Sequence, residues 1–249
     1  MNGARIFGEG PNPVLAIHGW FGHAGAWGPL VDSIDPERFT YAFIDIRGYG
    51  RNKDARGSWT VDEIAHDALS VADALGWSHF AVLGHSMGGM FAQRVATLAP
   101  ERVSRVACVN GVPASGYPFD EAGWDFFSSA ATQPEARRAI LDLTTGKRLS
   151  PFFIRQLLES SLENSTEEAF AGCLQAWGRT NFAEEAARIR APLHVILGEH
   201  DPAVPASLIE ATTRTTCPHA TVEVLANAGH YPMFEVPVAL ATSLERFLG

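Results

Sequence analysis

Short apolar segments alternate with longer amphipathic segments along most of the chain. The short segments are residues 14–17, 41–44, 80–83, 106–109, 193–197 and 222–225. Most of them are apolar at consecutive positions, which is typical of strands in a sheet whose two faces are both covered. Between them, apolar side chains recur at the helical period in residues 61–75, 89–98 and 238–248. Strands separated by helices predict right-handed crossovers, and therefore an α/β protein with a mostly parallel central sheet flanked by helices.

The alternation stops between residues 113 and 190, where no apolar run has the pattern of a strand. Helix start signals occur there instead, at Ser150-Pro151, Ser165/Glu168 and Asn181/Glu184. A similar capping pair, Thr60/Glu63, precedes the first amphipathic segment, and Gly76 ends that segment. We therefore predict a helical insertion over residues 113–190.

This insertion divides the predicted core into residues 1–112 and 191–249. It carries more large aromatic side chains than a surface loop needs. Most of these side chains are expected to form the insertion's own core and its contact with the main domain. A few are expected to face a substrate pocket, and the candidates are Trp124, Phe127, Phe153 and Trp177.

Charge and cysteine content exclude several classes of protein. The net charge is -9 and no run of Lys and Arg occurs, so neither nucleic acid nor an anionic membrane is an expected partner. The three cysteines are an odd number at wide spacing, which predicts neither a disulfide framework nor a zinc site. The first residues carry no basic, apolar leader, and no segment reaches the roughly 18 apolar residues of a membrane span. We expect a soluble, cytoplasmic protein.

The first chemical signal is a serine enclosed by small residues. Gly84-His85-Ser86-Met87-Gly88 fits the pattern G-x-S-x-G and lies between a predicted strand and a predicted helix. A turn this sharp brings backbones close together, and glycines on both sides of the serine avoid collisions. Free N–H groups at the start of the helix favour negative charge beside the hydroxyl. Ser86 is therefore the predicted nucleophile.

A serine hydroxyl needs a general base, and the base needs a carboxylate that orients it. His230 follows the last predicted strand, at the edge of the sheet where catalytic groups collect in α/β proteins. His85 is expected to point away from the site. Asp201 follows the preceding predicted strand and is the predicted acid, with Glu199 as its rival in the same loop.

A tetrahedral intermediate would need two hydrogen-bond donors for its oxyanion. The backbone N–H of Met87, directly after the predicted nucleophile, is the first candidate. The second is the backbone N–H of Trp20, in the loop after the first apolar segment, where Gly19 permits a close approach of the backbone.

In the order of its motifs the chain resembles the α/β-hydrolase superfamily, in particular its small capped serine esterases and lactonases. The motifs are His18-Gly19-Trp20, Asp45-Ile46-Arg47-Gly48-Tyr49-Gly50, Gly84 to Gly89, Gly198 to Asp201 and Gly229-His230. The resemblance implies that residues 45–50 form a structural turn and that residues 113–190 form a cap. Only about a dozen residues precede the first predicted strand, so the antiparallel strands that usually open this fold are expected to be shortened or partly absent.

These residues predict a serine hydrolase that forms an acyl-enzyme on Ser86 and needs neither a metal ion nor an organic cofactor. The aromatic pocket favours a small to medium, largely uncharged ester or lactone. Two alternatives remain open because one fold supports many functions. One is a cofactor-independent oxygenase or C–C bond hydrolase that uses the His/Asp pair, and the other is a ligand receptor with slow residual hydrolysis. The sequence makes no prediction of the oligomeric state.

Overall fold

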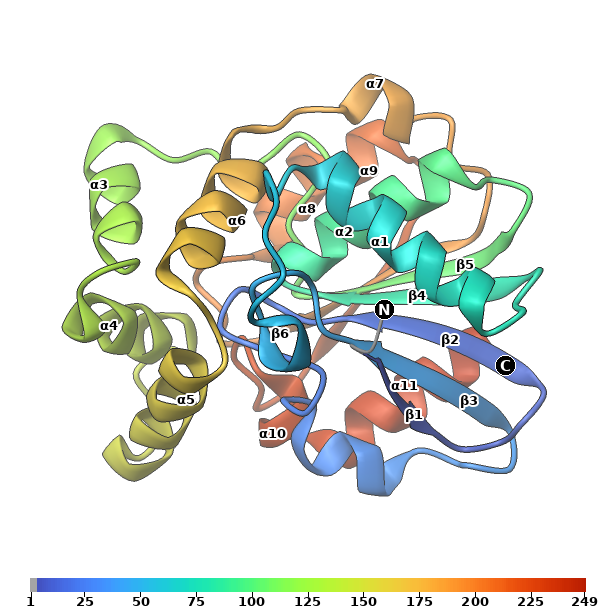
Figure 1. The fold of residues 1–249 in the computed structure, drawn as a ribbon, viewed down its shortest axis with the longest axis horizontal. Coiled ribbons are helices and arrows are strands. Elements are labelled where there is room, and N and C mark those ends of the chain that lie inside the picture. The colour runs from blue at the N-terminus through green and yellow to red at the C-terminus, as the bar shows by residue number, and fades with distance from the viewer. Residues whose placement is uncertain (1–3) are drawn as a thin grey trace.

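The centre of the molecule is a seven-stranded sheet, seen in a computed structural model that describes residues 4–249 (Figure 1). The strand order is β1-β3-β2-β4-β5-β6-β7, and all neighbouring pairs are parallel except β1 with β3. The strands are β1 (Ala4–Phe7), β2 (Asn12–Ile17), β3 (Phe39–Ile44), β4 (Phe80–His85), β5 (Val103–Val109), β6 (Leu193–Gly198) and β7 (Thr221–Leu225). All six predicted strands occur, so the predicted fold class is confirmed. Among the described residues, β1 is the only antiparallel strand at the start of the fold.

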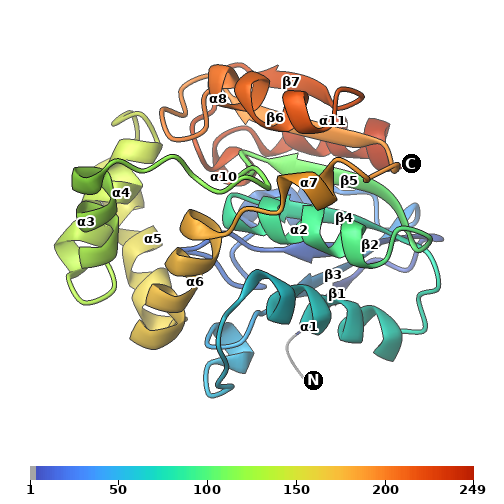
Figure 2. The ribbon, with the colours of Figure 1, turned by 90° about the horizontal axis from the view of Figure 1, so that it is seen from above.

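Helices cover both faces of the sheet (Figures 1 and 2). Those of the core are η1 (Gly28–Ser33), η2 (Gly50–Asn52), α1 (Val61–Ala74), α2 (Met87–Leu98), α8 (Ala206–Ala211), α9 (Thr213–Thr216), α10 (Pro232–Glu235) and α11 (Pro237–Leu248). Within residues 4–249 no helix is long and apolar enough to cross a bilayer.

Strand β2 shows why the strands are apolar at consecutive positions. Leu15 and Ile17 belong to the apolar cluster that contains α1 and α2, whereas Val14 and Ala16 belong to the cluster that contains η1 and α11. Side chains alternate between the two faces of a strand, so a strand covered on both sides needs an apolar residue at every position.

The helical insertion contains α3 (Glu121–Ser129), α4 (Pro134–Thr144), α5 (Pro151–Glu163), α6 (Glu167–Arg179) and the short α7 (Ala183–Ala186). Every residue from 113 to 190 is described, and none of them lies in a strand. Helices α3 to α6 gather at one end of the sheet, and α7 lies over the core (Figures 1 and 2).

Of the three predicted start signals in the insertion, one is met and two are wrong by one residue. Asn181 accepts from the Ala183 N–H, but the residue before α7 is Phe182 and no described side chain caps this helix. The Ser150 side chain accepts a hydrogen bond from the Phe153 N–H, as expected of a cap. The prediction of Ser165 as a cap was wrong by one residue: Thr166 caps α6, and the Ser165 hydroxyl instead donates to the Ser161 carbonyl. Two adjacent hydroxyl residues fit the same sequence pattern, and the burial of Ser165 decides between them.

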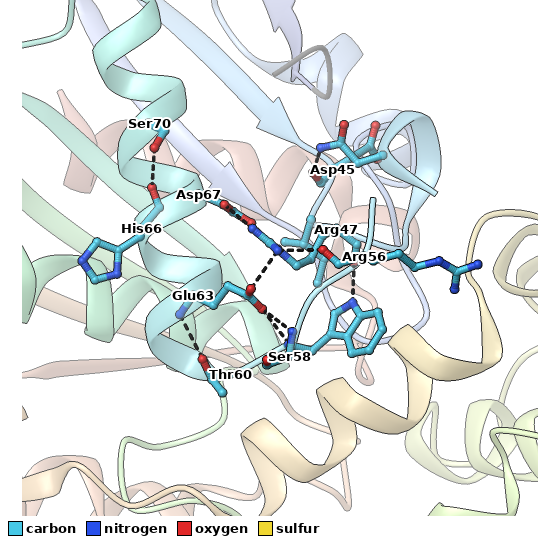
Figure 3. A network of polar contacts seen from close by, with 12 residues as sticks. Asp45, Arg47, Arg56, Ser58, Thr60, Glu63, His66, Asp67 and Ser70 are labelled. Atoms are coloured by element: carbon cyan, nitrogen blue, oxygen red, sulfur yellow. Dashed lines mark hydrogen bonds and ion pairs between the residues drawn. The ribbon is translucent and has the colours of Figure 1, made fainter. Parts of the chain in front are cut away.

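A network of charged groups fastens the turn after β3 to α1 (Figure 3). Arg47 donates to both carboxylate oxygens of Asp67, at 2.7 Å each, and to Glu63 Oε1 at 2.7 Å. The second Glu63 oxygen accepts from the N–H groups of Ser58 and Trp59. The predicted capping pair would have directed Glu63 to the Thr60 N–H. Because the carboxylate also binds Arg47, it holds the segment before the helix instead.

Four of the described histidines are buried, and two of them are His85 at the end of β4 and His18 directly after β2. The His85 Nε2–H donates to the carbonyl of His230 at 2.8 Å. Burial lowers the pKa of His85 to about 3, with a further contribution from the neighbouring His230. Burial likewise lowers the pKa of His18 to about 4. Both imidazoles are therefore neutral near pH 7.

This burial should make the fold sensitive to mild acid. The unfolded chain binds a proton at His85 below about pH 6.5, whereas the folded chain resists it until about pH 3, so stability is lost as the pH falls through that window. Between pH 7 and pH 5 the free energy of unfolding should fall by roughly 2 kcal/mol for each such histidine. Urea titrations at pH 7 and pH 5 measure this fall in the free energy of unfolding. In His85→Gln the fall should be smaller by the contribution of one histidine. His66→Gln, on the exposed surface of α1, is the control, and an equal effect of both variants would contradict the explanation.

Candidate active site

Ser86 lies in a backbone conformation that side chains rarely adopt, with φ of 54° at the junction of β4 and α2. The glycines around it are in crowded positions. A Cβ on Gly84 would lie 2.1 Å from the Gly88 carbonyl oxygen, and a Cβ on Gly88 would lie 2.2 Å from the Ile17 carbonyl oxygen. A Cβ on Gly89 would lie 2.6 Å from the Gly111 Cα. The tight packing of three backbone segments thus permits no side chain at these positions and leaves the serine hydroxyl at the carboxyl edge of the sheet.

His230 lies between β7 and α10, and its ring connects two other polar groups. Its Nε2 is 2.9 Å from the Ser86 Oγ, and its Nδ1 is 2.6 Å from Asp201 Oδ2. Because a carboxylate can only accept, Nδ1 carries the proton and Nε2 is free to accept from the serine hydroxyl. The structure therefore brings Ser86, His230 and Asp201 into one hydrogen-bonded chain.

Asp201 is buried, and its charge is strongly supported. Burial by itself would raise the pKa of Asp201, but His230 and the hydrogen bonds from Asn110 and the Ala203 N–H outweigh that effect and hold the pKa below its usual value. The rival Glu199 has a half-exposed side chain and accepts from the Asn227 N–H at 3.0 Å. Of the two acids, Asp201 is the one that contacts His230.

Asn110, directly after β5, is a member of the site that the sequence motifs did not identify. Its side chain is fully buried, and its amide donates to Asp201 Oδ2 and, at 3.3 Å, to the Gly229 carbonyl. Its Oδ1 accepts from the Gly198 N–H at 3.2 Å. Asn110 thus ties the ends of β5 and β6 to the His230 loop. A polar residue directly after a buried central strand was the signal that could have identified it.

Trp20 and Met87, the predicted sources of the oxyanion N–H groups, flank the serine from two elements. Met87 is the first residue of α2, and the first N–H groups of a helix have no acceptor within the helix. The Trp20 indole donates to the Phe170 carbonyl at 2.8 Å and stacks on the Phe170 ring at 3.9 Å. The loop after β2 is therefore anchored to α6 of the insertion.

Beside the serine lies a small cavity, the reaction chamber, of about 30 Å³. Ser86 and His230 line it together with mostly apolar groups, including Phe21 and the predicted Phe127 and Trp177. Among the described residues, no Asp, Glu, Lys or Arg lines this chamber. It suits an uncharged group.

The other two predicted aromatics lie elsewhere. Phe153 lines a second cavity of about 240 Å³ under α5. Trp124 packs against Phe119 at 5.6 Å with the Arg179 guanidinium 3.8 Å above its ring, and it lines neither of these cavities. Within residues 4–249 no group of three or more His, Cys, Asp or Glu side chains is arranged to hold a metal ion.

Two relatives with assigned activities align with nearly the whole chain. A pimeloyl-(acyl-carrier protein) methyl ester esterase of Serratia marcescens is 26% identical over 254 residues, which cover 98% of this chain and 96% of that protein. A dihydrolipoyllysine-residue acetyltransferase component of the acetoin cleaving system of Cupriavidus necator is 28% identical over 97% of this chain. The match spans only 65% of the length of that second relative.

A similar solved structure and the sequence pattern of the family agree with these matches. The enol-lactonase of Burkholderia xenovorans superposes with a TM-score of 0.83 at 24% identity, covering 98% of this chain and 95% of that one. The sequence pattern of the alpha/beta hydrolase fold matches residues 12–237. The chain belongs to the α/β-hydrolase family.

Proposed function

We propose that the chain is a serine hydrolase that cleaves a small to medium, largely uncharged carboxylic ester or lactone through an acyl-enzyme. The observation that carries this proposal is the continuous chain of hydrogen bonds from the Ser86 hydroxyl through His230 to the buried Asp201. The same three groups perform acyl transfer in serine hydrolases of several folds.

Each group has one task in the proposed reaction. His230 Nε2 takes the hydroxyl proton as Ser86 Oγ attacks the carbonyl carbon, and Asp201 stabilises the imidazolium that forms. The backbone N–H groups of Trp20 and Met87 stabilise the oxyanion. When the tetrahedral intermediate collapses, His230 gives its proton to the leaving oxygen. Water then attacks the acyl-enzyme by the same route and regenerates Ser86.

The nature of the substrate is supported by the lining of the site. Within residues 4–249, no Asp, Glu, Lys or Arg of the reaction chamber could pair with an ionised substrate, and the only titratable side chains that line it are those of His230 and Tyr117. Two of the similar proteins, a methyl ester esterase and an enol-lactonase, are named for the cleavage of an ester bond. An ester or lactone bond is therefore the proposed target, and no metal or cofactor takes part in the steps above.

The identity of the acid is tested by two matched substitutions. Asp201→Asn should lower kcat by about 10⁴, because the amide would favour the wrong tautomer of His230. Glu199→Gln, in the same loop but without contact to His230, should change kcat less than threefold. Steady-state hydrolysis of an activated ester such as p-nitrophenyl acetate measures both. Comparable losses in the two variants would contradict the assignment of Asp201.

The role of the serine separates acyl transfer from chemistry by the His/Asp pair alone. If Ser86 forms the covalent bond, Ser86→Ala and His230→Ala should both lower turnover by roughly 10³ to 10⁶. If the serine only donated a hydrogen bond, Ser86→Ala would cost about tenfold to a hundredfold. Circular dichroism establishes that both variants fold before turnover is measured. A nearly active Ser86→Ala beside an inactive His230→Ala would refute the hydrolase mechanism.

A further inference from the structure

The second cavity is larger than the reaction chamber and lies beside it. Its volume is about 240 Å³, against about 30 Å³ for the chamber that contains Ser86 and His230. It lies between α5 of the insertion, the loop after β2, and the segment from Tyr231 to Phe234. Among the described residues, Phe21 is the only one that lines both cavities. Phe21 is therefore the residue at which the two cavities adjoin.

The lining of the second cavity suits an uncharged, apolar group. Its aromatic and aliphatic members are Phe21, Trp27, Phe153, Leu157, Met233 and Phe234. The polar members include His18 and His85, whose lowered pKa values keep them neutral near pH 7. Of the residues described, no Asp, Glu, Lys or Arg lines this cavity. An alkyl or aryl chain would lose water there without leaving a charge unpaired.

The chemistry of the leaving group decides which part of an ester lies on which side. His230 Nε2 must give its proton to the leaving oxygen, so the alcohol part must lie next to His230. His230 lines the reaction chamber and not the second cavity. A free volume of about 30 Å³ has room for only on the order of two water molecules. The alcohol part is therefore small, and the acyl part extends away from His230.

We propose that the second cavity is the acyl-chain subsite, so that the preferred substrates are esters of a medium-length or bulky uncharged acid with a small alcohol. Phe21 is the specificity-determining residue, because the acyl chain of the substrate passes it between Ser86 and the second cavity. Its ring is only partly buried and contacts Trp20 and Phe170 at centroid distances of 5.0 and 5.3 Å, with no polar anchor. This inference rests on the proposed ester hydrolysis.

The test uses two series of esters. In the first, methyl esters extend the acid from butanoate to dodecanoate, and in the second, acetates extend the alcohol from methyl to octyl. Leu157→Trp fills the second cavity at a distance from Ser86. Leu162→Trp is its matched control, because Leu162 lies on the same helix, is 39% exposed and lines neither cavity in the described part of the chain.

Leu157→Trp should lower kcat/KM for methyl dodecanoate relative to methyl butanoate by about tenfold or more, and Leu162→Trp should leave this ratio unchanged. Phe21→Leu should raise the same ratio, because it opens the junction of the two cavities. Trp177→Phe enlarges the reaction chamber and should change the acetate series instead. Trp124→Phe is the control for Trp177→Phe.

Equal acyl-length profiles for Leu157→Trp and Leu162→Trp would overturn the assignment of the subsite, as would an effect of Leu157→Trp confined to the acetate series. A crystal structure of the wild-type protein labelled with a dodecyl fluorophosphonate gives a second readout, which does not depend on whether any variant folds. Its alkyl chain should lie against Phe153 and Leu157, and a chain elsewhere would refute the proposal. Failure of the proposed function is distinct: the wild-type protein would then hydrolyse no ester of either series and Ser86 would not be labelled.

Discussion

The site depends on the close packing of three backbone segments around one turn. Gly84, Gly88 and Gly89 let the end of β4 and the start of α2 approach the ends of β2 and β5 at distances that no Cβ could occupy. This packing stabilises the unfavourable φ of Ser86, which costs of order 1–3 kcal/mol at an isolated residue. Because the same contacts fix the strand ends relative to one another, they also set the distances between the loops that carry the other polar groups.

Further contacts connect the loops around the Ser86 turn to the insertion. The Trp20 indole donates to the Phe170 carbonyl of α6 and stacks on the Phe170 ring, and the guanidinium of the buried Arg137 of α4 lies 3.6 Å from the centroid of the same ring. Arg137 is held by the carbonyl of Ala130 and the hydroxyl of Ser165, so its charge has several acceptors although it is buried. The loop that is proposed to stabilise the oxyanion is thus packed against the insertion and not only against the core. A shift of α6 would move Trp20 with it.

The strands, the parallel sheet and the family were predictable because each rests on local patterns. Consecutive apolar residues indicate a sheet that is covered on both faces, and the order of the short motifs indicates the family. The contact between Asp201 and His230 was also predictable, because both follow strands that end at one edge. Asn110 was not identified, since its role depends on three hydrogen-bond partners that are far away in the sequence. Phe21 was not identified either, because a junction between two cavities is a property of packed shapes and leaves no periodicity in the chain.

Burial also determines which imidazole near the serine can act as a base. The ring of His85 is 5.1 Å from that of His230, close enough for two positive charges to repel strongly in a site of low polarity. Of these three imidazoles, His230 is the one hydrogen-bonded to Asp201, whereas burial keeps the pKa of His85 near 3 and that of His18 near 4. When His230 takes the serine proton in the proposed mechanism, the new charge therefore meets one carboxylate and two neutral rings. His85 also donates a hydrogen bond to the His230 carbonyl. The neutral His85 ring therefore fixes the position of the base without repelling the positive charge that His230 gains.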